Sequence, residues 1–300
     1  MTENAHRCGF VAIVGRPNVG KSTLINRLVG QKISIVSAKP QTTRHQLRGI
    51  LTRLNEQIIF VDTPGLHQSK GKLINKIINR TARNSISDVD LLLFVVDARG
   101  WRNEDDLILD IVRRSGVPVV LLINKTDRIK DRPQLLPFIG EVAKKHDFVH
   151  IIPVSAKTGE GMEQMIDSIV PLLPVSPPGY PEAQFTDRGE RFQAAEFVRE
   201  QIFRNLGQEL PYATAVEISD YEKEDKIDRI TAIIWVGHES QKAILIGKKG
   251  QKIRDIGTSA RQQMEKVFGR KIFLDLRVKV RSGWSNDQGF LRQLGYGEEN

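Results

Sequence analysis

Two patterns of apolar residues alternate along the first part of the chain. Short, nearly continuous apolar runs predict strands buried on both faces, and longer stretches with an apolar residue every three or four positions predict helices. The predicted strands are residues 10–14, 47–52, 57–62, 91–96, 117–123 and 151–154. The predicted helices are residues 23–29, 72–86, 103–115, 133–146 and 160–173. This alternation favours an α/β domain with a mostly parallel sheet and helices on both faces.

The last third of the chain has a different order of elements. A predicted helix comes first, followed by two strands, two helices and a third strand, which favours a smaller α+β domain. These elements are residues 190–206, 213–218, 230–236, 240–246, 251–268 and 271–280. A short amphipathic helix is predicted within residues 283–296, and we expect it to cap this domain. Contact of that helix with RNA bases or with a membrane surface is the alternative.

Proline marks the connection between these two parts. Five of the 13 prolines lie between residues 171 and 181. Proline lacks the N–H that a helix or sheet needs and stiffens the chain, so this stretch is predicted to be a semi-rigid linker. We therefore predict a first domain over 1–175, a linker over 176–187 and a second domain over 188–300.

Composition limits the class of protein further. With 40% hydrophobic and 27% charged residues the chain is typical of a globular protein, and no apolar run approaches the roughly 18 residues that cross a bilayer. The N-terminus runs directly into the first predicted strand, so no signal peptide is expected. A single cysteine, Cys8, rules out an internal disulfide. We expect a cytoplasmic monomer, with peripheral contact at the inner membrane left open.

The net charge of +9 is unevenly distributed within the last third of the chain. Residues 240–281 hold 12 Lys and Arg against 3 Asp and Glu, whereas residues 182–239 hold 7 against 13. A basic segment next to an acidic one indicates a directed contact with an anion such as nucleic acid.

A phosphate-binding motif, G-x-x-x-x-G-K-[ST], occupies residues 15–22 between the first predicted strand and the first predicted helix. Glycines let the main chain turn tightly, so that successive N–H groups and the helix N-terminus can surround phosphate oxygens. Lys21 would then contact the β- and γ-phosphates, and the Ser22 hydroxyl would hold Mg²⁺. The motif predicts that the chain binds a nucleoside triphosphate.

Three further motifs follow predicted strands, at the end of a parallel sheet where ligands bind. In the Asp-Thr-Pro-Gly motif, Asp62 can hold Mg²⁺ through water, and the N–H of Gly65 can reach the γ-phosphate. In the Asn-Lys-Thr-Asp motif, Asp127 can accept from the N1–H and the exocyclic amine of guanine, two donors that adenine lacks together. Residues 155–157 can offer N–H groups to guanine O6. The set favours GTP over ATP.

These motifs resemble a GTPase domain of the translation-factor class, and residues 41–45 resemble the first switch of the Era-type GTPases. The resemblance implies that Thr43, or alternatively Thr42, ligates Mg²⁺ when the γ-phosphate is present. The implied metal ligands are Ser22, Thr43 and Asp62, and the implied catalytic residues are Lys21, Thr43 and Gly65. The implied nucleotide contacts are Gly15, Asn18, Val19, Gly20, Lys21, Ser22, Thr23, Asp62, Asn124, Lys125, Asp127, Ser155, Ala156 and Lys157.

One position departs from the Ras-like pattern, in which a water-orienting glutamine follows the D-x-x-G glycine. Leu66 stands there, and its apolar side chain cannot orient water, so we expect slow intrinsic hydrolysis. His67 is a weak candidate for a general base, because a histidine in a polar loop is usually only solvated. Asn18 resembles the asparagine that holds K⁺ in GTPases without the glutamine, where K⁺ neutralises charge between the β- and γ-phosphates. A turn residue stabilised by its own side chain is the alternative.

The sequence Gly-Lys-Lys-Gly at 247–250 joins two predicted helices and resembles the G-x-x-G loop of KH-type RNA-binding modules, in their prokaryotic variety. In that module the loop clamps the backbone of about four nucleotides, glycines allow close approach, and lysines neutralise phosphates. A helix hairpin with a solvated lysine-rich turn is the alternative. The implied RNA contacts are Ile246, Gly247, Lys248, Lys249, Gly250 and Lys252.

Together the two resemblances cover the whole chain. The Era-type family implies a GTP-hydrolysing switch that uses GTP, GDP and Mg²⁺, binds the 3′ end of 16S rRNA and assists maturation of the small ribosomal subunit. One alternative is a switch that acts mainly on a protein or an inner-membrane partner in cell-cycle control, with RNA binding secondary. Another is a nucleotide-gated RNA scaffold that hardly hydrolyses GTP.

Overall fold

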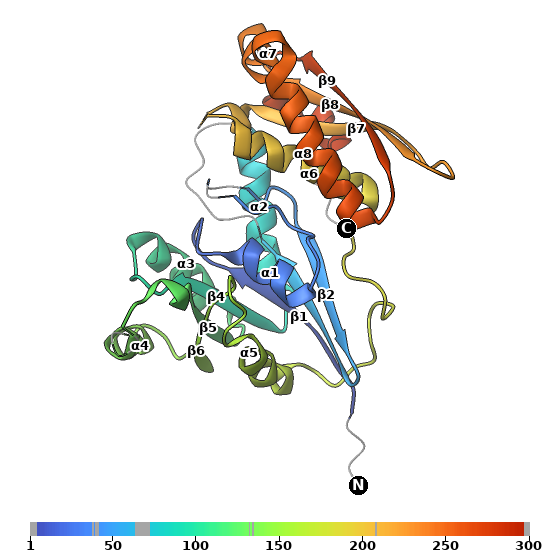
Figure 1. Ribbon diagram of the computed structural model, residues 1–300. Coiled ribbons are helices and arrows are strands. Elements are labelled where there is room, and N and C mark those ends of the chain that lie inside the picture. Colours follow the sequence, from blue (N-terminus) through green and yellow to red (C-terminus); the bar gives the residue numbers. More distant parts are fainter. Residues whose placement is uncertain are drawn as a thin grey trace. The chain divides into compact units, whose positions relative to one another are not determined.

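The structure is a computed structural model. It describes residues 5–37, 39, 42–63, 73–131, 133, 135–207 and 209–296. Two compact units can be distinguished in it (Figure 1). The first unit comprises the described residues of Met1–Ser34, Thr43–Gln68 and Asn79–Asp187. The second comprises the described residues of Ile35–Thr42, Ser69–Ile78 and Arg188–Asn300.

The first unit is built on a six-stranded sheet in the order β2-β3-β1-β4-β5-β6. The strands are β1 (Arg7–Val14), β2 (Leu47–Arg53), β3 (Glu56–Asp62), β4 (Leu91–Asp97), β5 (Val119–Asn124) and β6 (His150–Val154). All neighbours pair in parallel except β2, which forms an antiparallel hairpin with β3. The predicted, mostly parallel sheet is confirmed.

Helices cover both faces of this sheet (Figure 1). They are α1 (Lys21–Val29), α2 (Leu73–Ser87), α3 (Asn103–Ser115), α4 (Leu135–Ala143) and α5 (Met162–Ile169). The first part of α2, up to Ile78, belongs to the second unit. Along β1, Val11 and Ile13 face a core shared with α1 and α5, whereas Ala12 and Val14 face a core shared with α3 and α4. Because both faces are buried, the strands have the continuous apolar runs seen in the sequence. The predicted helix over 160–173 ends early, at Ile169, because Pro171 cannot supply the next helical N–H, and a 3₁₀ turn (Val170–Leu172) follows.

The proline-rich stretch continues along the first unit before the second begins. Phe185 O accepts from Ile50 N at 2.9 Å, and Thr186 pairs antiparallel with Gly49 of β2. Gln57, which is fully buried, accepts at Oε1 from the N–H groups of Gly179 and Tyr180, at 2.8 and 2.9 Å. These contacts hold the chain in place up to Asp187, the last residue of the first unit.

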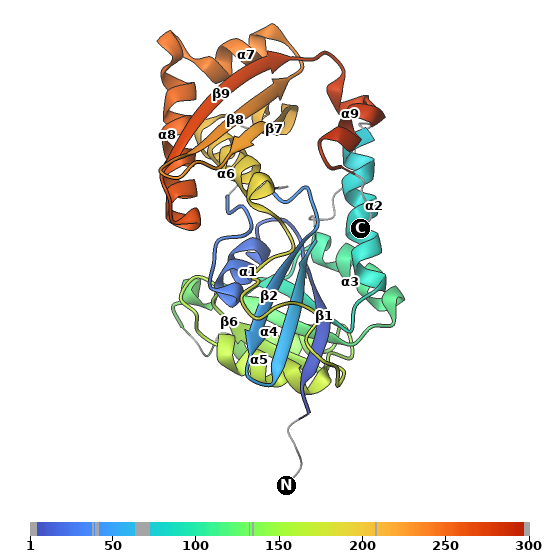
Figure 2. The same ribbon diagram turned by 90° about the vertical axis from the view of Figure 1, so that its right-hand side faces the viewer.

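The second unit contains a three-stranded sheet in the order β7-β8-β9 (Figure 2). Its strands are β7 (Thr214–Glu222), β8 (Asp228–Val236) and β9 (Ile272–Val280). Its helices are α6 (Glu190–Asn205), α7 (Glu239–Ile246), α8 (Gln251–Phe268) and α9 (Gln288–Gln293). Strand β7 is antiparallel to β8, and β9 is parallel to it. The predicted α+β arrangement is confirmed.

Two apolar clusters hold the second unit together. In the larger one, α6 and α8 pack on one face of the sheet, for example through Phe197, Ile256 and Ile234. In the smaller one, the C-terminal segment packs on Ala215 and Trp235, and the Phe290 ring meets the Trp235 ring edge-on with centroids 5.2 Å apart. The C-terminal helix therefore caps the unit, as expected. Within the described part of the chain, no helix has the length and apolar character that a bilayer span requires.

Candidate nucleotide-binding site and RNA-binding loop

The phosphate loop closes tightly over its own lysine. Gly15 has φ 155°, and a Cβ atom there would lie 2.5 Å from Val95 O, so only glycine fits. Lys21 begins α1 and is buried, and its Nζ donates to Gly15 O at 2.7 Å and to Arg16 O at 3.1 Å. The ammonium is thus held beneath the loop whose N–H groups would surround phosphate.

Burial also changes the chemistry of Lys21. Desolvation lowers the pKa of its ammonium from 10.5 to about 8, an effect that the carboxylate of Asp62 opposes and the guanidinium of Arg16 reinforces. A desolvated cation gains strongly from a nearby phosphate, because the surrounding protein screens that attraction less than water does. Lys21 is therefore suited to bind phosphate oxygens.

Four oxygen-bearing side chains meet beside the phosphate loop. Ser22 Oγ lies 3.3 Å from Thr43 Oγ1, and Thr43 Oγ1 donates to Asp62 Oδ2 at 3.4 Å. Ser34, which the sequence analysis did not select, donates from Oγ to the same Asp62 oxygen at 2.8 Å. Hydroxyl and carboxylate oxygens are the ligands that Mg²⁺ prefers, so this corner fits the metal.

The two candidate threonines have different surroundings. The side chain of Thr43 belongs to the oxygen cluster just described. Thr42 lies in the second unit, where its carbonyl accepts from Nη2 of the buried Arg199 of α6. Gly65, Leu66 and His67 lie outside the described residues.

The residues predicted to contact guanine lie on two neighbouring loops. The buried Asn124 joins them to the phosphate loop, since its Nδ2 donates to Val19 O at 2.8 Å and its Oδ1 accepts from Ala156 N at 2.9 Å. Asp127 is exposed, and its Oδ1 accepts from Ser155 Oγ at 2.7 Å. The buried Ser155 thereby orients the carboxylate that is predicted to read guanine.

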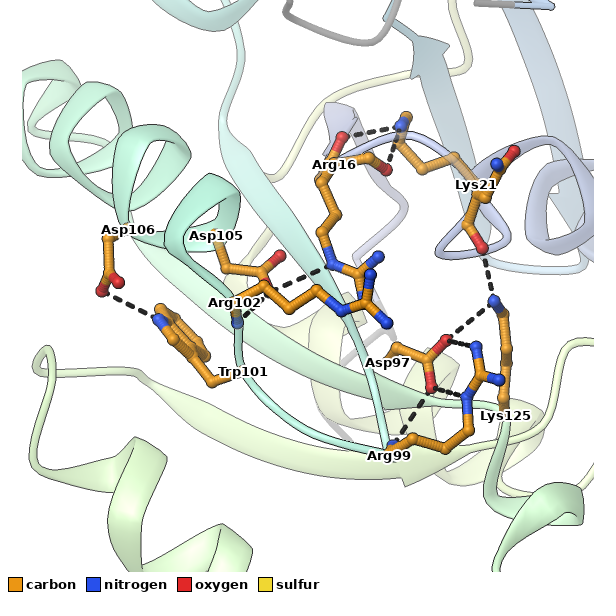
Figure 3. Close-up of polar contacts among 11 residues, drawn as sticks. Arg16, Lys21, Asp97, Arg99, Trp101, Arg102, Asp105, Asp106 and Lys125 are labelled. Atoms are coloured by element: carbon orange, nitrogen blue, oxygen red, sulfur yellow. Dashed lines mark hydrogen bonds and ion pairs between the residues drawn. The ribbon is translucent and has the colours of Figure 1, made fainter. Parts of the chain in front are cut away.

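Sequence reasoning missed two residues that hold these loops. Asp97, only 1% exposed, accepts at Oδ2 from Lys125 Nζ at 2.8 Å (Figure 3). Lys125 Nζ also donates to Asn18 O. Burial alone would raise the pKa of the Asp97 carboxyl, but hydrogen bonds from Arg99 and Lys125 outweigh it and bring the pKa well below its usual range. Asp97 is the last residue of β4 and pairs with Asn124, the last residue of β5. A polar residue at the end of an apolar run was the feature of the sequence that could have identified Asp97.

The second missed residue is Arg27 of α1. Its Nη2 donates to Lys157 O, and its Nε donates to Ala156 O at 3.4 Å. Nothing local in the sequence distinguishes this arginine from a solvated helix residue.

The Gly-Lys-Lys-Gly loop lies between α7 and α8 of the second unit. Gly247 has φ 72°, and a Cβ atom there would lie 2.7 Å from Cβ of Lys252. Lys249 also has a left-handed main chain, at φ 51°, and the side chains of Lys248 and Lys249 are both exposed. The loop thus presents two ammonium groups on a sharply turned main chain, with Ile246 half-buried just before it.

Comparison with known proteins identifies both units. Residues 10–125 match the family model of the 50S ribosome-binding GTPases, and residues 209–285 match that of the KH domain. GTPase Era of Stenotrophomonas maltophilia (strain R551-3) is 50% identical over 294 residues, which cover 98% of this chain and 99% of that protein. The chain belongs to the Era family of GTPases. GTPase Era of Coxiella burnetii (strain Dugway 5J108-111) is also 50% identical, with 97% of this chain and 98% of that protein covered.

Crystal structures of Era share the whole fold. Aquifex aeolicus Era bound to GDP·AlF₄⁻ has a TM-score of 0.93 at 39% identity, covering 97% of this chain and 100% of that one. Era in complex with MgGDPNP and nucleotides 1506–1542 of 16S ribosomal RNA also has a TM-score of 0.93 at 39% identity, covering 98% and 100%. The expected family, its GTPase activity and the combination of a phosphate-loop fold with a KH domain are therefore confirmed.

Proposed function

We propose that this chain is a GTP-hydrolysing switch that binds the 3′ end of 16S rRNA through its KH domain and assists maturation of the small ribosomal subunit. The observation that carries the proposal is the full-length similarity to an Era structure that holds both MgGDPNP and a fragment of 16S rRNA. The exposed lysines of the Gly-Lys-Lys-Gly loop support it, because such a loop clamps an RNA backbone. The proposed RNA contacts are Ile246, Gly247, Lys248, Lys249, Gly250 and Lys252.

The nucleotide site is proposed to work mainly through preorganised charge. Lys21 and the loop N–H groups would bind the β- and γ-phosphates, and Ser22, Thr43 and Asp62 would hold Mg²⁺, which supplies charge neutralisation when bound. Asp127, oriented by Ser155, would select guanine. Gly65 is proposed to donate its N–H to the γ-phosphate.

We also propose that Asn18 provides a ligand for K⁺. Its side chain is exposed, its main chain is left-handed at φ 63°, and its carbonyl is held by Lys125. GTP hydrolysis should be faster in KCl than in NaCl at equal ionic strength, and Asn18→Ala should remove the difference. Equal rates in both salts for the unsubstituted chain would contradict a K⁺ site.

The RNA-binding function can be tested by equilibrium binding of a labelled oligonucleotide with the sequence of the 16S rRNA 3′ end. Binding should be measured with a non-hydrolysable GTP analogue and with GDP, and a scrambled oligonucleotide at the same salt is the control, because phosphate contacts alone bind any RNA. We expect tighter, sequence-selective binding with the GTP analogue, by about 5- to 150-fold over GDP.

Equal binding of both oligonucleotides, whatever the nucleotide, would contradict the proposal. The search would then move to a protein or inner-membrane partner.

We further propose a cytoplasmic monomer, for which sedimentation of the purified chain with and without anionic vesicles is the direct test. Co-sedimentation with vesicles would instead indicate peripheral membrane contact.

A further inference from the structure

A buried carboxylate at the start of α3 is paired with an arginine of the phosphate loop. Asp105 is fully buried, and its Oδ2 accepts from Arg16 Nε at 3.1 Å and from Arg102 N at 3.0 Å (Figure 3). The bond from Arg102 N closes the first turn of α3, as in a capping box. The bond from Arg16 reaches a residue 89 positions earlier, inside the phosphate-binding motif.

Arg16 connects this carboxylate to the lysine of the motif. Its guanidinium turns toward α3, whereas its carbonyl accepts from Lys21 Nζ at 3.1 Å (Figure 3). Arg16 is 8% exposed, so its side chain is fixed inside the protein. Any movement of Arg16 would therefore displace an acceptor of Lys21.

The ion pair is poorly explained as a stabilising contact. Both groups are buried, and such pairs often contribute less to stability than apolar residues of the same volume, because desolvation offsets the attraction. Among the described residues, no donor reaches the second oxygen of Asp105, Oδ1, although it too is buried. Closing the first turn of α3 requires only an acceptor, which an uncharged asparagine would supply equally well. The negative charge points to a role toward Arg16.

We infer that Asp105 is a positioning residue for nucleotide binding, which holds the phosphate loop in its binding conformation through Arg16. The inference rests on the nucleotide site proposed above. It assigns to α3 an indirect part in phosphate binding, through the contact of Asp105 with Arg16. Removing the charge of Asp105 would leave the Arg16 guanidinium with a neutral acceptor in place of its counter-ion. Arg16, and with it the carbonyl that accepts from Lys21 Nζ, would then be held less firmly.

The test is a double-mutant cycle on the full-length chain. Asp105→Asn keeps an acceptor for Arg102 N but removes the charge, Arg16→Gln removes the other partner, and the double variant removes both. The readouts are the affinity for GDP with Mg²⁺ and the rate at which labelled GDP dissociates from a preformed complex. The dissociation rate counts only folded protein, so a loss of stability alone does not change it. Asp106→Asn is the matched control, since Asp106 is the next residue, is half exposed and binds Trp101 Nε1 instead.

We expect each single variant to weaken GDP binding about tenfold, mainly through faster dissociation, and the double variant to lose no more than either single variant. Asp106→Asn should bind like the unsubstituted chain. If Asp105→Asn does not fold, the double variant, which buries no unpaired charge, should still bind about tenfold more weakly. Unchanged binding by Asp105→Asn, or losses that multiply in the double variant, would overturn the inference. Failure of both the unsubstituted chain and Asp106→Asn to bind GDP would instead contradict the nucleotide site itself.

Discussion

Two basic side chains of the nucleotide-binding motifs are held by carboxylates that lie outside the four motifs. Asp97 holds Lys125, and Asp105 holds Arg16, across 28 and 89 positions of sequence. The motif residues could be predicted because the residues of each motif lie close together in the sequence. Their supports could not, because each contact exists only once the order of the strands brings distant segments together.

Lys21 is expected to lower the stability of the nucleotide-free protein. Because folding lowers its pKa from 10.5 to about 8, the unfolded chain binds more protons between these pH values, and stability rises with pH across that window. Lys21→Met, which fills the space without a charge, should raise the free energy of unfolding by about 1–3 kcal/mol at pH 7. Urea unfolding of both proteins without nucleotide measures this.

The pH dependence provides the control for this variant. Other groups titrate equally in both proteins, so the difference between the two unfolding free energies isolates Lys21. That difference should be constant below pH 8 and shrink toward pH 10.5. A difference that does not change with pH would show that the effect of Lys21→Met comes from packing and not from the buried charge.

Asp127 should determine the choice of base. Asp127→Asn replaces one carboxylate oxygen, an acceptor, with an amide NH₂ group, a donor. Guanine then loses the acceptor for one of its two donors. Xanthine has a carbonyl in place of the exocyclic amine, and that carbonyl can accept from the new NH₂ group. We expect GDP affinity to fall by about 10²-fold or more and xanthosine diphosphate to bind better than GDP. Competition against a fluorescent nucleotide measures both. Asp131→Asn, an exposed carboxylate on the same loop, should leave the preference for guanine unchanged.

At the scale of helices and strands, the sequence predicted nearly all of the architecture. The helix Gln251–Phe268 has the predicted bounds, because glycines flank it at both ends in the left-handed conformation. The helix predicted over 133–146 is shorter, Leu135–Ala143, since only its middle has residues that pack on the core. The 3₁₀ turn before β7 (Leu210–Ala213) was missed, because it depends on how Pro211 is buried.

The loop between α7 and α8 should act on RNA mainly through charge. Lys248→Ala together with Lys249→Ala should weaken RNA binding for all sequences and reduce the slope of log affinity against log salt by about 1–2. Salt titrations of oligonucleotide binding measure the slope. Arg114→Ala with Lys144→Ala removes two exposed cations from α3 and the residues after α4, and should leave the slope unchanged. An unaltered slope in the loop variant would argue that the solvated-turn alternative is correct.

At the scale of the whole molecule, the chain contains separate apolar cores in two compact units. Separate cores can unfold separately, and a ligand stabilises only the unit that binds it. Differential scanning calorimetry should therefore resolve two transitions. GDP with Mg²⁺ at about 100 times its dissociation constant should stabilise only the first unit, by about 2.7 kcal/mol. Equal shifts of both transitions would contradict independent units.

The segment along β2 determines where the chain can be divided. A division at residue 175, which the prolines suggest, would strip Phe185 and Thr186 from β2 and leave Gln57 buried without its two main-chain donors. An uncovered edge strand is a template for pairing with another molecule. We expect residues 1–175 alone to self-associate and residues 1–187 to remain monomeric, as sedimentation velocity can show. Residues 176–187, which the sequence predicts to be a linker, would then have a second role, namely to keep β2 from pairing with another molecule.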